Sequence, residues 1–115
     1  MIKNSALIIT LCVILLSCND SQKQSINQLK IGKEQYYNSK FDSSLNYLNQ
    51  AINIDSENAE AFYYLGKVNY RINNYNDGLR YLGLAEQKSY NSDSIEVLKL
   101  QLLWKMQKYE DYINL

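Results

Sequence analysis

Side chains able to do covalent or acid–base chemistry are scarce in this sequence. It contains no histidine, and its only cysteines are Cys12 and Cys18. The commonest general base, thiol nucleophile and soft metal ligands are therefore largely missing. The one adjacent acidic pair near the end of the chain, Glu110-Asp111, would point in different directions on a helix. The four glycines are isolated, so no phosphate-binding loop is present. We predict that the protein is not an enzyme and holds neither a cofactor nor a metal.

Cys18 is the side chain whose position suggests a covalent modification. The chain begins with a short positively charged segment, residues 1–4, which contains Lys3. An almost wholly apolar segment follows from Ala6 to Leu16, and Ser17-Cys18 comes directly after it. This order is typical of a secretory signal. The apolar run is about 11 residues long and a membrane-spanning helix needs about 20, so a retained transmembrane anchor is the less favoured alternative.

The junction Leu15-Leu16-Ser17-Cys18 resembles the lipobox of bacterial lipoproteins, where a small residue precedes the cysteine that becomes the first residue of the mature chain. The resemblance implies a lipid on the Cys18 sulfur, removal of the signal peptide at residues 1–17 and a protein held on a membrane. The alternative is an ordinary secretory signal with a chance cysteine, and Leu15 disfavours it because an ordinary cleavage site has small residues at both flanking positions. Asn19, in the place where aspartate retains some lipoproteins in the inner membrane, favours the outer membrane of the bacterial envelope.

The charge of the chain is balanced and evenly spread. There are 12 basic and 12 acidic side chains, and loss of Lys3 with the signal would leave 11 basic ones. Binding to nucleic acid requires a concentrated basic surface, and the sequence has no basic run. We therefore expect no nucleic-acid partner.

A period of 34 residues predicts the architecture of the rest of the chain. Self-similarity at this interval is typical of a helix–turn–helix unit that stacks into an α-solenoid. We expect an all-α domain over residues 25–115, made of repeats at 25–58 and 59–92 and an incomplete repeat at 93–115. A polar stretch at residues 18–24 is expected to be a flexible tether. The residues that recur at this interval are Gly32 and Gly66, then Phe41, Tyr75 and Tyr109, and then Ala51 and Ala85.

The second repeat shows how the helices are expected to pack. Phe62, Leu65 and Val68 fall on one face of a helix, as expected for a side that is buried. Gly78 and Gly83 are small residues at which the following helix could approach a neighbour closely. Polar turns at residues 38–40 and 73–74 are expected to separate the helices, because asparagine tolerates a left-handed backbone.

The segment Ala59–Tyr70, followed by Asn74–Gly78 and Ala85, resembles the tetratricopeptide repeat. The large aromatic residue of that family falls at Phe62 and its Leu-Gly pair at Leu65-Gly66. In the third repeat, Lys99-Leu100 stand where the Leu-Gly pair would be. The resemblance implies a helical solenoid that binds other polypeptides.

The resemblance also implies a binding groove on a concave face lined by the first helix of each repeat. Tyrosine and tryptophan with scattered lysine and arginine suit an extended or helical peptide, because aromatic residues and arginine dominate binding hot spots. The alternative that many of these tyrosines only cover solvent-facing turns stays open. The candidate groove residues are Leu29, Lys33, Tyr36 and Tyr37 in the first repeat, Tyr63, Tyr64, Lys67, Tyr70 and Arg71 in the second, and Gln101 and Trp104 in the third.

Some repeats of this family bind the carboxylate tail of heat-shock chaperones through lysine, asparagine and arginine side chains at five fixed positions. All five positions depart from that pattern here, and an exported protein would not meet those chaperones. We do not expect that ligand class. The five positions are Leu29, Lys33, Tyr64, Ser94 and Leu98.

The third repeat would reach Leu115 about halfway along its second helix. Solenoids generally need about three repeats and a polar end, whereas this end is apolar, with several leucines and the single tryptophan of the sequence. A partner protein, a second copy of the chain or further repeats of a longer array could cover it. We predict a lipid-anchored interaction or assembly adaptor of the bacterial cell envelope that binds a peptide or protein. The alternative is a truncated fragment of a longer array with a purely structural role.

Overall fold

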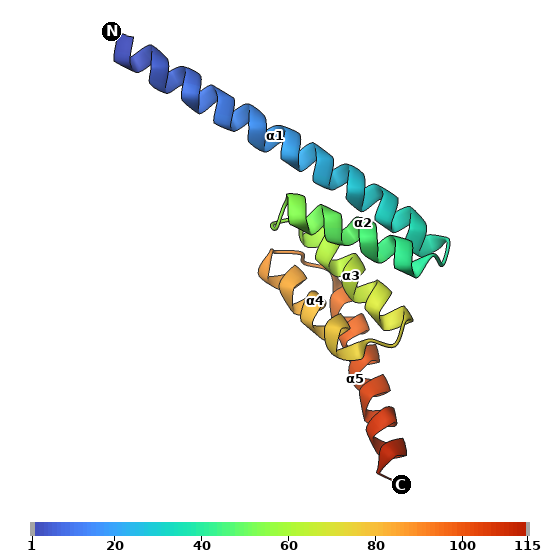
Figure 1. Ribbon diagram of the computed structural model, residues 1–115. Coiled ribbons are helices and arrows are strands. Elements are labelled where there is room, and N and C mark those ends of the chain that lie inside the picture. The colour runs from blue at the N-terminus through green and yellow to red at the C-terminus, as the bar shows by residue number, and fades with distance from the viewer. Residues whose placement is uncertain (1, 115) are drawn as a thin grey trace.

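The computed structural model describes residues 2–114, without the side chains of Ile2, Tyr109 and Tyr112, and shows five helices packed in the order of the sequence (Figure 1). The array is extended, measuring 77 × 26 × 22 Å. The predicted all-α fold is confirmed. The side chain of Tyr109 and the terminal Leu115 lie outside the described residues. The helices are α1 at Ile2–Tyr37, α2 at Phe41–Ile54, α3 at Ala59–Arg71, α4 at Tyr75–Gln87 and α5 at Asp93–Ile113.

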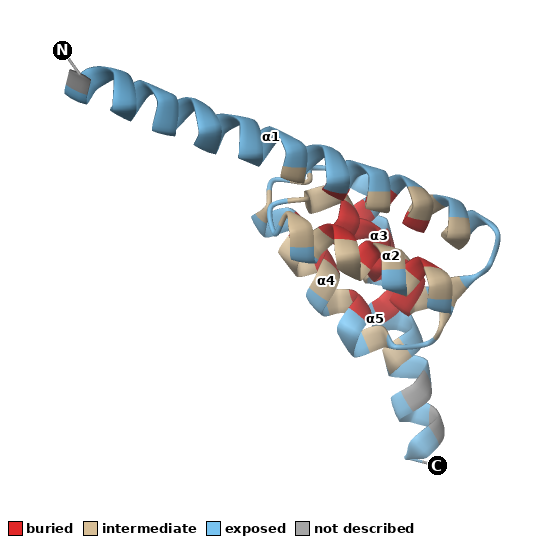
Figure 2. Cartoon of the chain, turned by 45° about the horizontal axis from the view of Figure 1, so that its top comes forward, coloured by how far each residue is buried: buried red, intermediate tan, exposed pale blue. Residues whose placement is uncertain are grey.

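The first half of α1 extends away from the other helices, and the second half packs on α2 (Figures 1 and 2). Residues 3–20 are exposed, and the first buried side chain is that of Ser25. By length and composition, α1 could cross a membrane, and a signal sequence would have the same character. The expected flexible tether at residues 18–24 is helical in the structure. Because this stretch has no glycine or proline, the packed helix continues through it.

Glycine allows the two helices of each hairpin to approach closely. A Cβ atom built on Gly32 would lie 2.8 Å from Leu48 Cδ2 of α2, and one built on Gly66 would lie 2.5 Å from Leu82 Cδ2 of α4. Gly78 likewise faces Leu102 of α5. The expectation for Gly83 is wrong, because a Cβ atom there would meet nothing within 4 Å.

Left-handed residues end three of the helices. Ser39, Asn73 and Ser89 have φ angles of 58°, 65° and 67°, and each lies in a short connection before the next helix. The turns expected at residues 38–40 and 73–74 are therefore present. The turn at Ser89 separates the second repeat from α5.

The third repeat differs from the other two because α5 is one uninterrupted helix of 21 residues. The expected second helix of this repeat does not form within the described residues. At the interval that relates Ser39 to Asn73, the third repeat has Gln107, which favours the helix and has no tendency to adopt a left-handed backbone. The last turns of α5 therefore continue past the other helices (Figure 1).

Candidate functional site

A groove lies where α1, α3 and α5 come together on one side of the array, with a volume of about 500 Å³. It contains predicted groove residues from all three repeats, so the structure brings together residues that lie far apart in the sequence. We call it the aromatic groove. Its lining residues are Tyr36, Tyr63, Lys67, Tyr70, Arg71, Asp93, Ser94, Val97, Leu98 and Gln101.

Four tyrosines form a connected cluster at the α1 side of this groove. The Tyr36 ring lies 5.3 Å from Tyr37 and 6.0 Å from Tyr64, and the Tyr63 ring lies 5.5 Å from Tyr64, all three pairs edge to face. Tyr63 also stacks on Tyr90, with 4.9 Å between the ring centroids. Such pairs hold the rings in fixed orientations, so the tyrosine cluster is a rigid wall.

The Lys67 ammonium group lies among these four rings. Its nitrogen is 4.9 Å from the centroid of Tyr64, 5.0 Å from Tyr36, 5.5 Å from Tyr63 and 5.7 Å from Tyr37. Each contact is within the range of a cation–π interaction. The faces of the rings therefore stabilise the charge without using the hydrogen-bond donors of the ammonium group.

Lys33 differs from Lys67 because it has a carboxylate partner. Its ammonium group donates a hydrogen bond to Glu60 Oε1 at 2.6 Å, and it also lies 5.0 Å from the Tyr64 ring. The hydrogen bond to Glu60 raises the pKa of Lys33. This ion pair joins α1 to α3 at the edge of the tyrosine cluster.

Tyr64 and Tyr37 share a hydrogen bond between their hydroxyl groups at 3.0 Å. Burial of the Tyr64 side chain, and then this hydrogen bond, raise the pKa of Tyr64 above that of an ordinary tyrosine. The phenol of Tyr64 therefore holds its proton more strongly in the folded protein than in the unfolded chain.

Three predicted groove residues are buried in the core. Leu29, Tyr63 and Tyr64 are only 6%, 8% and 7% exposed. Leu29 does not line the aromatic groove, and it packs within the core instead. Tyr63 and Tyr64 are covered by neighbouring rings, so most of their surface supports the groove and little of it faces solvent.

A second hollow, of about 880 Å³, continues from the aromatic groove along α5. Tyr70, Val97 and Gln101 line both. Trp104 lines only this second hollow, where it is 58% exposed and has Lys105 and Lys108 each 5.6 Å from its ring. We call it the α5 hollow. Its other lining residues are Leu100, Leu103 and Lys105.

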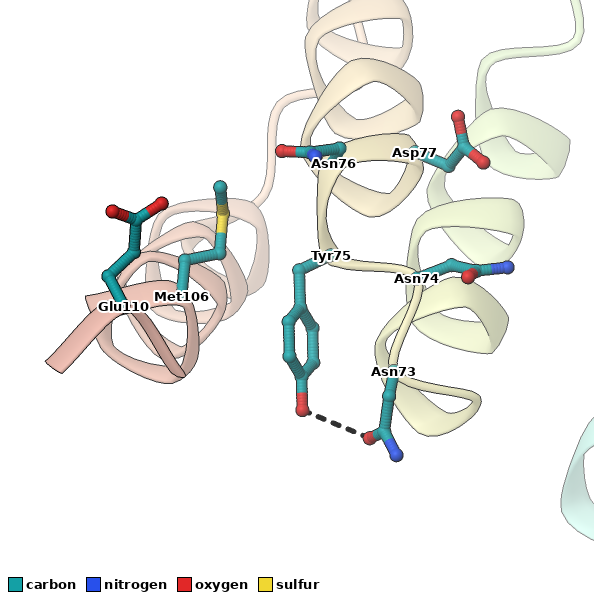
Figure 3. Close-up of a pocket in the computed structure, with 7 residues that line it drawn as sticks. All are labelled: Asn73, Asn74, Tyr75, Asn76, Asp77, Met106 and Glu110. Carbon is teal, nitrogen blue, oxygen red and sulfur yellow. Dashed lines mark hydrogen bonds between the residues drawn. The ribbon is translucent and has the colours of Figure 1, made fainter. Parts of the chain in front are cut away.

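A third hollow lies between the start of α4 and the far half of α5 (Figure 3). Tyr75 extends into the space between the two helices, and its hydroxyl group donates a hydrogen bond to Asn73 Oδ1 at 3.0 Å. Met106 and Glu110 line the α5 side. This polar hollow is present where α5 continues as a single helix beyond α4, and it contains none of the predicted groove residues.

Cys18 is exposed on α1, seven positions before the first buried side chain, Ser25. Its sulfur is therefore accessible to a modifying enzyme. Within residues 2–114, no group of three histidine, cysteine, aspartate or glutamate side chains comes together in a way that could hold a metal ion.

The structure shows that residues outside the predicted set either contact groove residues or line the groove. Tyr90 stacks on Tyr63, and the Arg71 guanidinium group lies 5.0 Å from the ring of Phe41. Asp93 places a carboxylate on the groove wall. Tyr90 and Phe41 lie outside the first helix of a repeat, so a rule based on helix position cannot find them. Asp93 is the first residue of α5, at the position equivalent to Ala59, the first residue of α3, so the 34-residue period could have identified it.

Residues 32–73 match a family model for the TPR repeat, the tetratricopeptide repeat. This stretch covers the end of α1 and all of α2 and α3, which hold Tyr36, Lys67 and Arg71. Repeats of this kind are associated with protein–protein interaction and are typically not catalytic. A search among curated proteins finds no match to the chain.

Proposed function

We propose that this protein is an interaction adaptor of the bacterial cell envelope, held on a membrane by a lipid on Cys18, which binds a partner protein through the aromatic groove. The TPR match over residues 32–73 supports protein–protein interaction. The observation that carries the proposal is the groove itself, in which α1, α3 and α5 together present tyrosines with two cations.

The composition of the groove suits the binding of a polypeptide. Tyrosine, tryptophan and arginine are the residues most enriched among binding hot spots. The ring contacts among Tyr36, Tyr63 and Tyr64 hold the wall in place before a partner arrives. These groove side chains therefore lose little conformational entropy when a partner binds, which favours affinity.

Site-specific crosslinking in the native host tests this proposal. A photoreactive amino acid replaces either Gln101, exposed in the groove, or Asn46, exposed on α2. We expect a discrete adduct with a second polypeptide from position 101 and none from position 46. Tyr70→Ala should abolish the adduct, whereas Tyr47→Ala, at a half-buried tyrosine of α2 outside the groove, should leave it. Equal adducts from both positions would contradict a groove function.

The lipid anchor has a separate test. Because residues 3–20 are exposed, removal of residues 1–17 would expose no core side chain. We expect the protein purified from its own membranes to have the mass of a chain that begins at Cys18 and carries acyl groups. Cys18→Ser should remain unprocessed. A chain that retains Met1 and has no lipid would contradict the anchor and leave the groove function unaffected.

We also propose that two copies of the chain pair through the outer side of α5. Leu100 and Leu103 are 66% and 51% exposed there. They do not line the aromatic groove, but they line the α5 hollow, so a partner side chain that enters this hollow would replace the second copy. Leu100 stands at the interval where Gly32 and Gly66 admit the second helix of a hairpin, so a helix that followed α5 could not pack here as closely as α2 packs on α1. A symmetric pairing of the same patch would cover both copies at once.

A further inference from the structure

Within the part of the chain that the structure describes, two cations of the aromatic groove have no carboxylate partner. Four ion pairs join described residues, and they take up Lys33, Arg80, Lys88 and Lys99. Lys67 and Arg71 belong to none of them. The Lys67 nitrogen lies against tyrosine rings, and the Arg71 guanidinium group lies 5.0 Å from Phe41 and 6.0 Å from Tyr36.

The acidic groups near the groove do not neutralise these two cations. Glu60 is already engaged by Lys33 at 2.6 Å. Asp93 lines the groove from α5 and makes no ion pair within the described residues. The groove lining therefore has Lys67 and Arg71 against Asp93, and the nearby Lys33 and Glu60 neutralise each other, so an excess of positive charge favours an anionic ligand.

Lys67 and Arg71 are four positions apart on α3, so they lie on one face of the helix. The cation–π contacts of Lys67 leave its N–H donors free, and the Arg71 guanidinium group can donate two parallel hydrogen bonds to one carboxylate. The rings around the partly buried Lys67 reduce the access of water to its ammonium group, which strengthens a charge–charge contact there, whereas Arg71 is exposed.

We propose that Lys67 and Arg71 bind the side-chain carboxylate of an acidic residue within a peptide segment of the partner, and that a neighbouring apolar side chain of the same segment enters the α5 hollow beside Val97 and Trp104. The inference rests on the proposed groove function and names the chemistry of its ligand. An internal acidic residue fits better than a chain end, because the groove continues past these cations into the α5 hollow through Tyr70 and Gln101.

Binding of defined peptides to the full-length protein in detergent tests the proposal. The probes are fluorescent decapeptides with blocked ends, so that no terminal carboxylate contributes. Each contains glutamate or its neutral analogue glutamine, together with leucine or serine two to five positions away. We expect the glutamate–leucine peptides to bind about tenfold more tightly than their glutamine–leucine analogues, as is typical for a hydrogen bond to a charged group. The difference should decrease as salt is added.

Matched variants assign that difference to the two cations. Lys67→Met keeps an apolar side chain among the rings and removes the charge, and Arg71→Gln removes the second cation from an exposed position. Each should lower the preference for glutamate by about tenfold. Lys23→Met and Arg80→Gln make the same substitutions outside the groove and should leave the preference unchanged. Circular dichroism of all four variants checks that the helices are intact.

The outcomes separate this inference from the groove function. A preference for glutamate that is lost in Lys67→Met and Arg71→Gln supports both. Equal binding of glutamate and glutamine peptides, lost only in Tyr70→Ala, would overturn the carboxylate site and leave the groove function standing. A glutamate preference that survives both substitutions would also overturn the inference. If no peptide binds at all while the crosslink from position 101 still forms, the carboxylate site is wrong and the partner binds by a different surface chemistry.

Discussion

Glycine and leucine at equivalent positions decide which helices of this chain can pair closely. Gly32 and Gly66 each face a buried leucine of the second helix in the same hairpin. At the same interval, Leu100 replaces the glycine and is 66% exposed. A side chain of that size occupies the space that a closely packed helix would need. Within residues 2–114 the third repeat has no closely packed hairpin, and the leucine at position 100 is consistent with this.

The two glycines at positions 66 and 83 predict opposite effects of the same substitution. Gly66→Ala should place a methyl group 2.5 Å from Leu82 Cδ2, and Leu82 is fully buried and cannot move easily. Gly83→Ala fills open space and gains helix propensity of about 0.5–1 kcal/mol. We expect Gly66→Ala to be less stable than Gly83→Ala by about 1–3 kcal/mol in urea denaturation. Equal stability of the two variants would show that the α3–α4 contact is looser than the structure indicates.

The raised pKa of Tyr64 predicts that the folded protein loses stability at alkaline pH. Because its pKa is raised in the folded protein, the unfolded chain loses the proton first, above pH about 10. Stability from this group is therefore present below that pH and decreases as pH rises, by up to about 1.4 kcal/mol per pH unit. Tyr64→Phe should flatten the dependence of the unfolding free energy on pH between about 10 and 12. Tyr47→Phe, on α2, is the control, and an identical alkaline profile for Tyr64→Phe and the parent would contradict the prediction.

At the scale of the helices, a buried polar contact joins α1, α2 and the start of α3. Ser25 of α1 is fully buried, and its hydroxyl group donates to the carbonyl of Ala51 in α2 at 2.8 Å. It accepts a hydrogen bond from Asn58 Nδ2 at 2.8 Å, and Asn58 Oδ1 in turn accepts from the backbone N–H of Ala61 at the start of α3. One hydroxyl group thus links α1, α2 and the cap of α3.

Ser25→Ala should cost about 1–2 kcal/mol of unfolding free energy, because the Asn58 amide loses its acceptor in a partly buried place. Ser21→Ala is the matched control one turn earlier on α1, where the hydroxyl group donates to Ser17 in an exposed contact. That control should stay within about 0.5 kcal/mol of the parent. Thermal denaturation of both variants measures the difference, and equal losses would show that Ser25 does not join the helices.

At the scale of the whole molecule, the exposed leucines on the outer side of α5 predict self-association. We expect the purified protein to be a dimer in sedimentation equilibrium, paired through the outer side of α5. Leu103→Glu should place a charge in the interface and give monomers. Gln107→Glu places the same charge on the same helix at an exposed polar residue and should leave the dimer intact. A parent protein that sediments as a monomer at all concentrations would contradict the pairing.

The period of the sequence was sufficient to predict the all-α fold. Gly32, Gly66 and the turn residues report local requirements, namely close helix approach and a left-handed backbone, which depend on residue type at fixed spacing. The expectation failed at Gly83 and at residues 18–24. At Gly83 no neighbouring helix is present among the described residues, and periodicity within one helix carries no information about that. At residues 18–24 the packed helix continues because the stretch has no glycine or proline.

By itself, the sequence determined the 34-residue architecture, the position of Cys18 at the end of an apolar segment and the tyrosine-rich composition of the first helices. Only the tertiary structure decided that Leu29, Tyr63 and Tyr64 are buried, and that no carboxylate among the described residues pairs with Lys67 or Arg71. The reason is that burial and ion pairing depend on groups from different repeats. The rings around Lys67 come partly from α1, about thirty positions earlier in the chain, and only packing of α1 on α3 brings them to its charge.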